Sequence, residues 1–220
     1  MVPKKLHYCW FGGAEMPKLS MRCEESWNVY APDYEVFRWS ENNTFDIESK
    51  YFRKCLKDEM WAFASDYIRL FRLYEYGGVY LDTDMELIRP LDTLLSEFEH
   101  SEAIFCEERN GIISAGFIYA KKESPIIGEA LRFYDNNLKV GEYVNIPKIL
   151  SAVYRSRAKE LDVKVLPKEC FYPYNPYDKG DVGQLMYSDV KSNTFGIHHW
   201  QKSWKKSLKH RIYERFFSHI

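Results

Sequence analysis

Cysteine is scarce and unpatterned in this 220-residue chain, which excludes two kinds of protein. The five cysteines are widely spaced and form no Cys-x-x-Cys pair, so neither a disulfide framework nor a zinc knuckle is indicated. Long apolar runs are also missing, and none approaches the roughly 20 residues that a membrane helix needs. No long apolar stretch follows Lys4 and Lys5, so we expect no secretory signal and a reducing, cytoplasmic location.

An excess of charge of either sign is absent as well. The chain holds 31 basic and 32 acidic residues, a net charge of −1. Proteins that coat DNA or RNA are normally basic, so we expect no nucleic-acid partner. Aromatic residues are abundant, at 17% of the chain, and their rings can fill a core or stack on bases and sugars. With 45% hydrophobic residues and no repeat or linker, the composition predicts one folded domain, residues 1–220.

The pattern of apolar residues predicts an α/β domain. A short strand at 4–10, a helix at 17–30 and a strand at 34–39 form a β-α-β unit, which favours parallel strands. The strongest helical pattern covers 58–76, and an apolar strand that turns acidic follows at 79–88. Further segments are expected as strands at 103–106, 112–120 and 163–167, helices at 124–136 and 147–161, and a rigid exposed loop at 171–177. We therefore expect a mostly parallel mixed sheet flanked by helices.

Two carboxylates lie at the exit of the apolar strand. Residues i and i+2 of a strand point to the same side, so Asp82 and Asp84 should project together where ligands of open α/β sheets bind. Converging carboxylates repel each other unless a cation lies between them, and Mn²⁺ or Mg²⁺ suits oxygen donors. An EF-hand is excluded because Leu87 and Thr93 occupy its glycine and glutamate positions. A pair of solvated loop aspartates and an aspartyl phosphatase remain as alternatives.

The helix before this strand carries a polar stripe. At 100° per residue, Ser65, Asp66, Arg69 and Arg72 share one face. Asp66 and Arg69 are three residues apart, a spacing that also suits a simple ion pair on a helix surface. The functional interpretation makes Arg69 a clamp for phosphate or sugar and Asp66 an acceptor for hydroxyl groups.

The C-terminal part combines histidines, tryptophans and basic residues. Adjacent histidines on a strand point to opposite faces, so only one of His198 and His199 is expected at a given metal. Residues 202–220 are rich in lysine and arginine with interleaved apolar residues, which suits a basic amphipathic helix lying on an anionic membrane. A capping helix with a solvated basic face is the alternative.

Taken together, these motifs resemble the family 32 glycosyltransferases, bacterial sugar transferases of polysaccharide synthesis related to the yeast initiating mannosyltransferase. They are also similar to the catalytic domains of the clostridial glucosylating toxins. The resemblance rests on four segments in order along the chain, namely residues 3–13, Ala64–Arg69, Gly77–Asp84, and His198–Trp200 with Ser203–Trp204.

The resemblance implies a GT-A fold, a Rossmann-like domain that binds a nucleotide-sugar through Mn²⁺ or Mg²⁺ and retains the anomeric configuration. Asp82, Asp84 and His198 would form the metal site, and Asp66, Arg69, Asp82 and Asp84 would carry the chemistry. The nucleotide-sugar would contact a wider set, in which Trp10 stacks on the base: His7, Trp10, Gly12, Gly13, Ser65, Asp66, Arg69, Tyr80, Asp82, Ser203 and Trp204.

Two departures concern the donor sugar and the tail. Ala115 stands where many relatives have an asparagine in the donor-sugar pocket, and Ser203 and Trp204 are adjacent where the toxins space them by two. Glu107 and Glu108 are further carboxylates without a motif behind them. An aromatic residue after a short strand suits uracil, so we expect a UDP-sugar donor, with GDP-mannose as the alternative. The acceptor is expected to be a saccharide or a lipid-linked saccharide. A non-catalytic sugar-binding protein of the same fold is the alternative from another class.

Overall fold

The structure, a computed structural model, describes residues 3–109, 111–138, 142–178, 180 and 182–201. The basic helix predicted at 202–220 lies outside the described residues, and so do Ser203 and Trp204. Within the described part of the chain, no helix is long and apolar enough to cross a membrane.

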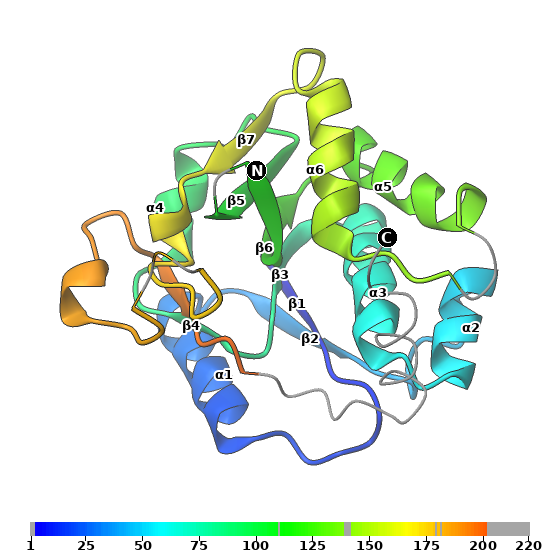
Figure 1. Cartoon of the computed structure of the whole chain (residues 1–220), viewed down its shortest axis with the longest axis horizontal. Helices are drawn as coiled ribbons and strands as arrows, with labels where there is room; N and C mark the ends of the chain where they lie inside the picture. Colours follow the sequence, from blue (N-terminus) through cyan, green and yellow to red (C-terminus); the bar gives the residue numbers. More distant parts are fainter. Residues whose placement is uncertain (1–2, 110, 139–141, 179, 181, 202–220) are drawn as a thin grey trace.

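A six-stranded mixed sheet forms the centre of the domain, in the order β2-β1-β3-β6-β5-β7 (Figure 1). The strands pair in parallel except β6, which is antiparallel to both of its neighbours. Their bounds are β1 Lys5–Cys9, β2 Glu35–Trp39, β3 Gly78–Leu81, β5 Ala103–Arg109, β6 Ile112–Ala120 and β7 Val163–Leu166. The predicted mostly parallel mixed sheet is confirmed.

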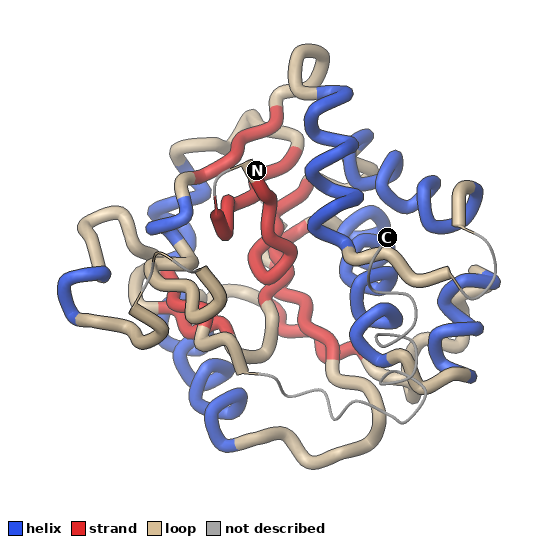
Figure 2. Tube along the Cα trace, in the orientation of Figure 1, coloured by secondary structure: helices blue, strands red, loops and turns tan. Residues whose placement is uncertain are grey.

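Helices cover both faces of this sheet (Figure 2). One face packs against α2, α3, α5 and α6, and the other against α1, α4 and the short strand β4. The helices are α1 Lys18–Tyr30, α2 Lys50–Lys57, α3 Trp61–Tyr76, α4 Leu91–Ser96, α5 Pro125–Asn136 and α6 Ile146–Arg157. Side chains along β3 point alternately to the two faces of the sheet. Val79 and Leu81 pack in the core on one face, and Tyr80 packs in the core on the other.

The helix predicted at 58–76 begins later than expected, and a separate helix precedes it. The hydroxyl of Ser49 accepts a hydrogen bond from the backbone N–H of Phe52 and caps α2, which ends at Lys57. Glu59 then adopts a left-handed conformation (φ 57°), which breaks the helical path before Trp61. The α4 helix was also not predicted.

The strand predicted at 79–88 is interrupted at the two aspartates. The β3 strand ends at Leu81, and a turn closed by a 2.9 Å hydrogen bond from the Met85 N–H to the Asp82 carbonyl follows. The chain then leaves the main sheet as β4 (Met85–Leu87), which pairs antiparallel with β8 (Gly196–His198). The convergence expected from strand alternation is therefore produced by a turn.

The segment 171–177 is not the exposed loop that its prolines suggested. Phe171 and Tyr172 have no exposed surface, and the Phe171 ring stacks on Phe117 of β6 at 3.8 Å between centroids. Tyr174 is buried too, and Tyr177 is half-exposed. The aromatic side chains fill the core beneath β4 and β8, which outweighs the preference of the prolines for the surface.

Candidate active site

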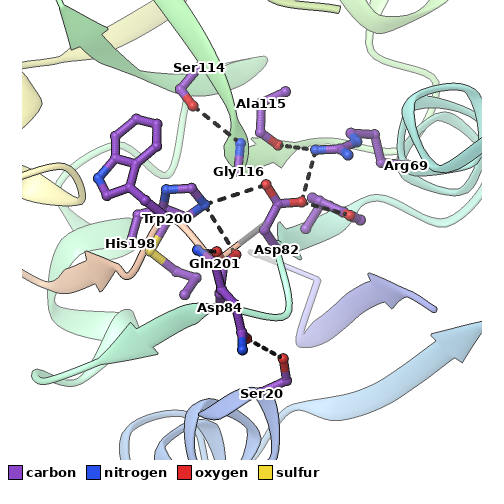
Figure 3. Close-up of polar contacts among 12 residues, drawn as sticks. Ser20, Arg69, Asp82, Asp84, Ser114, Ala115, Gly116, His198, Trp200 and Gln201 are labelled. Atoms are coloured by element: carbon purple, nitrogen blue, oxygen red, sulfur yellow. Dashed lines mark hydrogen bonds and ion pairs between the residues drawn. The ribbon is translucent and has the colours of Figure 1, made fainter. Parts of the chain in front are cut away.

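Two acidic residues and a histidine from distant parts of the sequence meet at the end of β3. The turn after β3 carries Asp82 and Asp84, and β8 presents His198 beside them (Figure 3). The Nε2 atom of His198 lies 3.1 Å from Asp84 Oδ1 and 3.8 Å from Asp82 Oδ2. One donor atom from each of the three residues lies within 4.8 Å of the others. The residues predicted as metal ligands are therefore adjacent.

His198, the last residue of β8, and the following His199 point to opposite sides, as extended-chain geometry predicts. His198 contacts Asp84, whereas His199 Nε2 lies 2.8 Å from Glu86 Oε2 on the other side of the small sheet. Pairing of Met85 with His198 sets this arrangement. Among the pair, only His198 belongs to the acidic site.

The charged forms of Asp84 and His198 stabilise each other. Burial opposes ionisation of Asp84, but His198 and the backbone N–H of Gln201, which donates to Asp84 Oδ2 at 2.7 Å, hold its pKa below the ordinary value. Burial also opposes the charging of His198, yet the carboxylates of Asp84 and Asp82 raise its pKa above 6.5. The other ring nitrogen of His198, Nδ1, is buried with no hydrogen-bond partner among the described residues.

Arg69 connects α3 to the acidic site. Its guanidinium, whose side chain is 7% exposed, lies 3.1 Å from both Asp66 Oδ1 and Asp82 Oδ1. It also donates to the Ala115 carbonyl at 2.7 Å and lies over the Tyr80 ring at 4.4 Å. Arg69 and Asp66 are thus not a solvated surface pair. A buried cation bridges two carboxylates at the edge of the site.

Asp66 is the carboxylate with the most unusual environment on α3. Its burial raises the pKa to about 6, although the charge of Arg69 acts in the opposite direction. The same stripe contains Ser65, whose hydroxyl is buried and has no hydrogen-bond partner in the described part of the chain. Arg72 departs from the stripe's expected role, since it pairs with Asp46 and Glu75 and lies over Trp39.

Tyr80 lies beneath the site, on the side of the sheet that α3 covers. Its hydroxyl donates to Asp82 Oδ1 at 3.0 Å, the oxygen that also contacts Arg69. Oδ1 of Asp82 is therefore held from two directions, and Oδ2 remains on the side of His198. The predicted group of Asp66, Arg69, Tyr80 and Asp82 is brought together by the fold.

The loop that follows β1 packs against the indole of Trp61. Gly12 and Gly13 have φ values of 90° and 65°, a conformation that glycine adopts without strain. A Cβ on Gly12 would lie 2.8 Å from Nε1 of Trp61, so the indole of α3 occupies the close approach that two glycines permit. Trp10 is 4% exposed, and its indole N–H donates to the Ala14 carbonyl at 2.6 Å.

His7, predicted to contact the nucleotide, has a structural position instead. It has no exposed surface, its Nε2 lies 3.0 Å from the Gly77 carbonyl, and Trp39 donates to its Nδ1 at 3.2 Å. Both nitrogens are thus engaged by the protein, and burial lowers its pKa to about 4. The sequence could not show that β1 is a central strand flanked by two others.

Several further residues contact the triad, and the role of Gln201 among them was not predicted. The backbone of Gln201 holds Asp84, and its side chain accepts a hydrogen bond from Ser20 of α1 at 3.4 Å (Figure 3). Trp200 packs edge-on against His198 at 4.5 Å and has a left-handed backbone (φ 54°). Glu108, whose pKa is raised by burial, also interacts with the His198 charge. Backbone contacts of this sort leave no signal in the sequence.

The donor set fits a divalent cation. Two carboxylates and one imidazole nitrogen suit Mn²⁺, and hard oxygen ligands suit Mg²⁺. The proximity of Asp82, Asp84 and Nε2 of the buried His198 is a feature that a bound cation would explain.

Comparison with solved structures identifies the fold. The chain is similar to the PaToxG glycosyltransferase, with a TM-score of 0.60, 16% identity, and coverage of 72% of this chain and 70% of that one. It is also similar to a glycosyltransferase involved in glycosylation of the major capsid of PBCV-1, with a TM-score of 0.53, 14% identity, and coverage of 90% and 95%. These likenesses confirm the predicted GT-A fold.

Comparison with curated sequences gives relatives that share part of this chain. Inositol phosphoceramide mannosyltransferase 3 of Schizosaccharomyces pombe is 32% identical over 98 residues, which cover 43% of this chain and 27% of that protein. An uncharacterised protein of Arabidopsis thaliana is 25% identical over 119 residues, covering 50% of this chain and 18% of that protein. The matched regions thus span under a third of either relative. Residues 17–100, which include Asp66, Arg69 and the Asp82–Asp84 turn, match the family described as a glycosyltransferase sugar-binding region containing a DXD motif.

Proposed function

We propose that this chain is a metal-dependent glycosyltransferase that moves a sugar from a nucleotide-sugar to a saccharide acceptor. The observation that carries the proposal is the convergence of Asp82, Asp84 and His198, from distant parts of the sequence, within 4.8 Å of one another. The match of residues 17–100 to a DXD-containing glycosyltransferase family supports it. The buried contacts of Arg69 with Asp66 and Asp82 count against a non-catalytic scaffold, which would have no need of so costly an arrangement.

Asp84, Asp82 and His198 would hold the cation, and the imidazole favours Mn²⁺ over Mg²⁺, which prefers an all-oxygen set. When bound, the cation neutralises negative charge on the departing nucleoside diphosphate as a Lewis acid. The backbone N–H of Gln201 and the ring of Trp200 fix Asp84 and His198 in advance, so little reorganisation accompanies binding.

In this proposal Arg69 compensates the negative charge of the site. Its charge offsets those of Asp66 and Asp82, which lets three carboxylates share one site before any ligand is present. Ser65 offers a buried hydroxyl without a partner among the residues that the structure describes, which suits a ligand hydroxyl such as that of the donor's ribose or sugar. Asp66, with a pKa of about 6, can accept from or donate to a sugar hydroxyl near neutral pH.

The donor in this proposal is a UDP-sugar, with retention of the anomeric configuration. The support is the aromatic residue after the short first strand, Trp10, a position that suits stacking on uracil. GDP-mannose is the alternative, favoured by one observation: the curated relative in Schizosaccharomyces pombe is named as a mannosyltransferase.

The acceptor in this proposal is a glycan or a lipid-linked saccharide of bacterial capsular or exopolysaccharide synthesis, handled in the cytoplasm. The same relative is named for a lipid acceptor, inositol phosphoceramide. Residues 202–220 carry Lys202, Lys205, Lys206, Lys209, Arg211 and Arg215 against Glu214 as the single acid, which suits peripheral contact with an anionic membrane.

A thermal-shift experiment tests the proposal. UDP and GDP are each added with and without Mn²⁺ to the native chain, to Asp84→Asn and to the control Glu86→Gln. Glu86 lies two residues further on and pairs with His199 rather than with the triad, so its charge change should leave binding intact. A ligand at about 100 times its Kd stabilises by roughly 2.7 kcal/mol. We expect a shift that needs UDP and Mn²⁺ together and is lost only in Asp84→Asn.

The other outcomes separate the alternatives. A shift with GDP alone among the nucleotides would change the donor to GDP-mannose. Binding without slow hydrolysis of any nucleotide-sugar would indicate a non-catalytic binding protein, and phosphate release from an aryl phosphate would indicate a phosphatase. No shift with either nucleotide would contradict the proposal.

A further inference from the structure

Tyr172 is a buried tyrosine whose hydroxyl is unsatisfied. The residue has no exposed surface, and its Oη atom has no hydrogen-bond partner among the described residues. A weak interaction with the Ser114 side chain acts on it, but without the geometry of a hydrogen bond. Buried hydroxyls are normally paired, so an orphan beside a functional site needs an explanation.

The missing side chain of Gly116 lets this hydroxyl approach the backbone closely, next to the carboxylate of Asp82. A Cβ on Gly116 would lie 2.9 Å from Tyr172 Oη and 2.9 Å from Asp82 Oδ2. The two oxygens are therefore at most twice that distance apart, and both border the same point. Gly116 does not have a left-handed backbone conformation, so glycine is needed here because a Cβ would collide with these two oxygens.

The Asp82 oxygen beside Gly116, Oδ2, is the one left for a ligand. Oδ1 of Asp82 contacts Arg69 and accepts from Tyr80, whereas Oδ2 faces His198 Nε2 at 3.8 Å. Tyr172 thus adds a hydroxyl donor on the same side of Asp82 as the metal-binding triad.

The position of Tyr172 is fixed by its neighbours. Its ring packs edge-on to His198 at 5.4 Å and lies 5.8 Å from Trp200. The preceding carbonyl, of Phe171, accepts a 3.0 Å hydrogen bond from the His198 N–H. The hydroxyl is therefore held beside the triad by the same strand that supplies His198.

We propose that Tyr172 is a positioning residue whose hydroxyl, beside Asp82 at the backbone of Gly116, donates a hydrogen bond to an oxygen ligand of the cation held by Asp82, Asp84 and His198. This inference rests on the proposed metal site. The oxygen belongs either to a water or to the diphosphate of the donor. An outer group of this kind orients the ligands of a metal, and its loss typically weakens metal binding by 10- to 100-fold.

The test compares Tyr172→Phe with the matched control Tyr119→Phe. Tyr119 lies on β6, is 1% exposed and also has a buried hydroxyl with no partner among the described residues, but it neighbours Glu102 rather than the triad. Calorimetric titration measures binding of Mn²⁺ alone, and of UDP in the presence of Mn²⁺. Urea unfolding without ligand measures the structural contribution of each hydroxyl.

We expect neither variant to unfold at a lower urea concentration than the native chain, because each loses an unpaired buried hydroxyl. Tyr172→Phe alone should raise a Kd, by about tenfold. Weaker binding of Mn²⁺ alone would identify the oxygen as water, and weaker binding of UDP only would identify it as a diphosphate oxygen. A second variant, Gly116→Ala, should weaken the same binding step, because its Cβ would displace the Tyr172 hydroxyl and the Asp82 carboxylate.

Two results would overturn the inference. One is a Tyr172→Phe protein that binds Mn²⁺ and UDP as tightly as Tyr119→Phe does. The other is a Tyr172→Phe protein that unfolds at distinctly lower urea than the control, which would give the hydroxyl a structural role. Failure of the native chain to bind Mn²⁺ or UDP would instead contradict the proposed function, and this inference with it.

Discussion

Replacing Arg69 with methionine should reveal how the acidic site is held together. Methionine keeps most of the side-chain volume but removes the charge that lies 3.1 Å from both Asp66 and Asp82. These carboxylates are only 12% and 29% exposed, so water cannot fully replace the guanidinium. Removing one partner of a buried ion pair costs about 3–5 kcal/mol, and we expect Arg69→Met to lose stability in this range at pH 7.5.

Arg72→Met is the matched control, one turn further along α3. The Arg72 side chain is even less exposed, at 2%, but its partners Asp46 and Glu75 are 55% and 38% exposed. Their charges stay solvated when the arginine is removed, and each such pair contributes about 0–1 kcal/mol. Loss of the cation–π contact with Trp39, at 4.3 Å, adds about 0.5–2 kcal/mol. The control should therefore lose clearly less stability than Arg69→Met.

The pH dependence of Arg69→Met provides a second check. Burial raises the pKa of Asp66 to about 6 in the folded protein, above its ordinary value of 3.8. A raised carboxyl pKa favours folding at low pH, and this contribution is lost as the pH rises through 6. Without Arg69 the pKa of Asp66 rises further, so the stability lost in Arg69→Met should be smaller at pH 5 than at pH 7.5. Urea unfolding measures both variants. Equal losses for Arg69→Met and Arg72→Met, or a loss independent of pH, would refute this reasoning.

Two further predictions concern the scaffold. Burial lowers the pKa of His7 from 6.5 to about 4, so protonation of the unfolded chain should cost roughly 3 kcal/mol of stability as the pH falls from 7 to 4. Urea unfolding of His7→Gln should show a flatter dependence over this interval, and an unchanged slope would contradict the assignment. Gly78→Ala should lose about 2–4 kcal/mol, because φ is 111° and the new Cβ would lie 2.4 Å from the Lys5 carbonyl oxygen. Gly13→Ala, with φ 65° and nothing within 4 Å, isolates the backbone contribution of about 1–2 kcal/mol, and a loss as large as that of Gly78→Ala would argue against the steric explanation.

Features that depend only on residues close together in the sequence were predictable. The spacing of Asp66 and Arg69 places both on one face of α3, and the pair does lie at the site. Alternation at the end of β8 correctly separates His198 from the following His199. The end of an apolar strand correctly locates Asp82 and Asp84 at the edge of the sheet.

Some errors arose where packing outweighed local preference. Prolines suggested that 171–177 is exposed, but Phe171 and Tyr172 fill the core against β6 and β8. Histidine is a residue type that often binds ligands, yet His7 lies on an interior strand, where it is buried between Trp39 and the Gly77 carbonyl. The local sequence does not specify which strands will pair with a given strand.

The sequence by itself determined the α/β architecture, the acidic turn after β3 and the polar face of α3, because these depend on residues within one or two turns of each other. Only the tertiary structure decided that β8 pairs with β4 and thereby places His198 3.1 Å from Asp84, more than a hundred residues away in the chain. It also decided that Tyr172 faces Asp82 across Gly116. Contacts of this kind form because burying the aromatic core fixes the position of distant segments, and no local pattern encodes them.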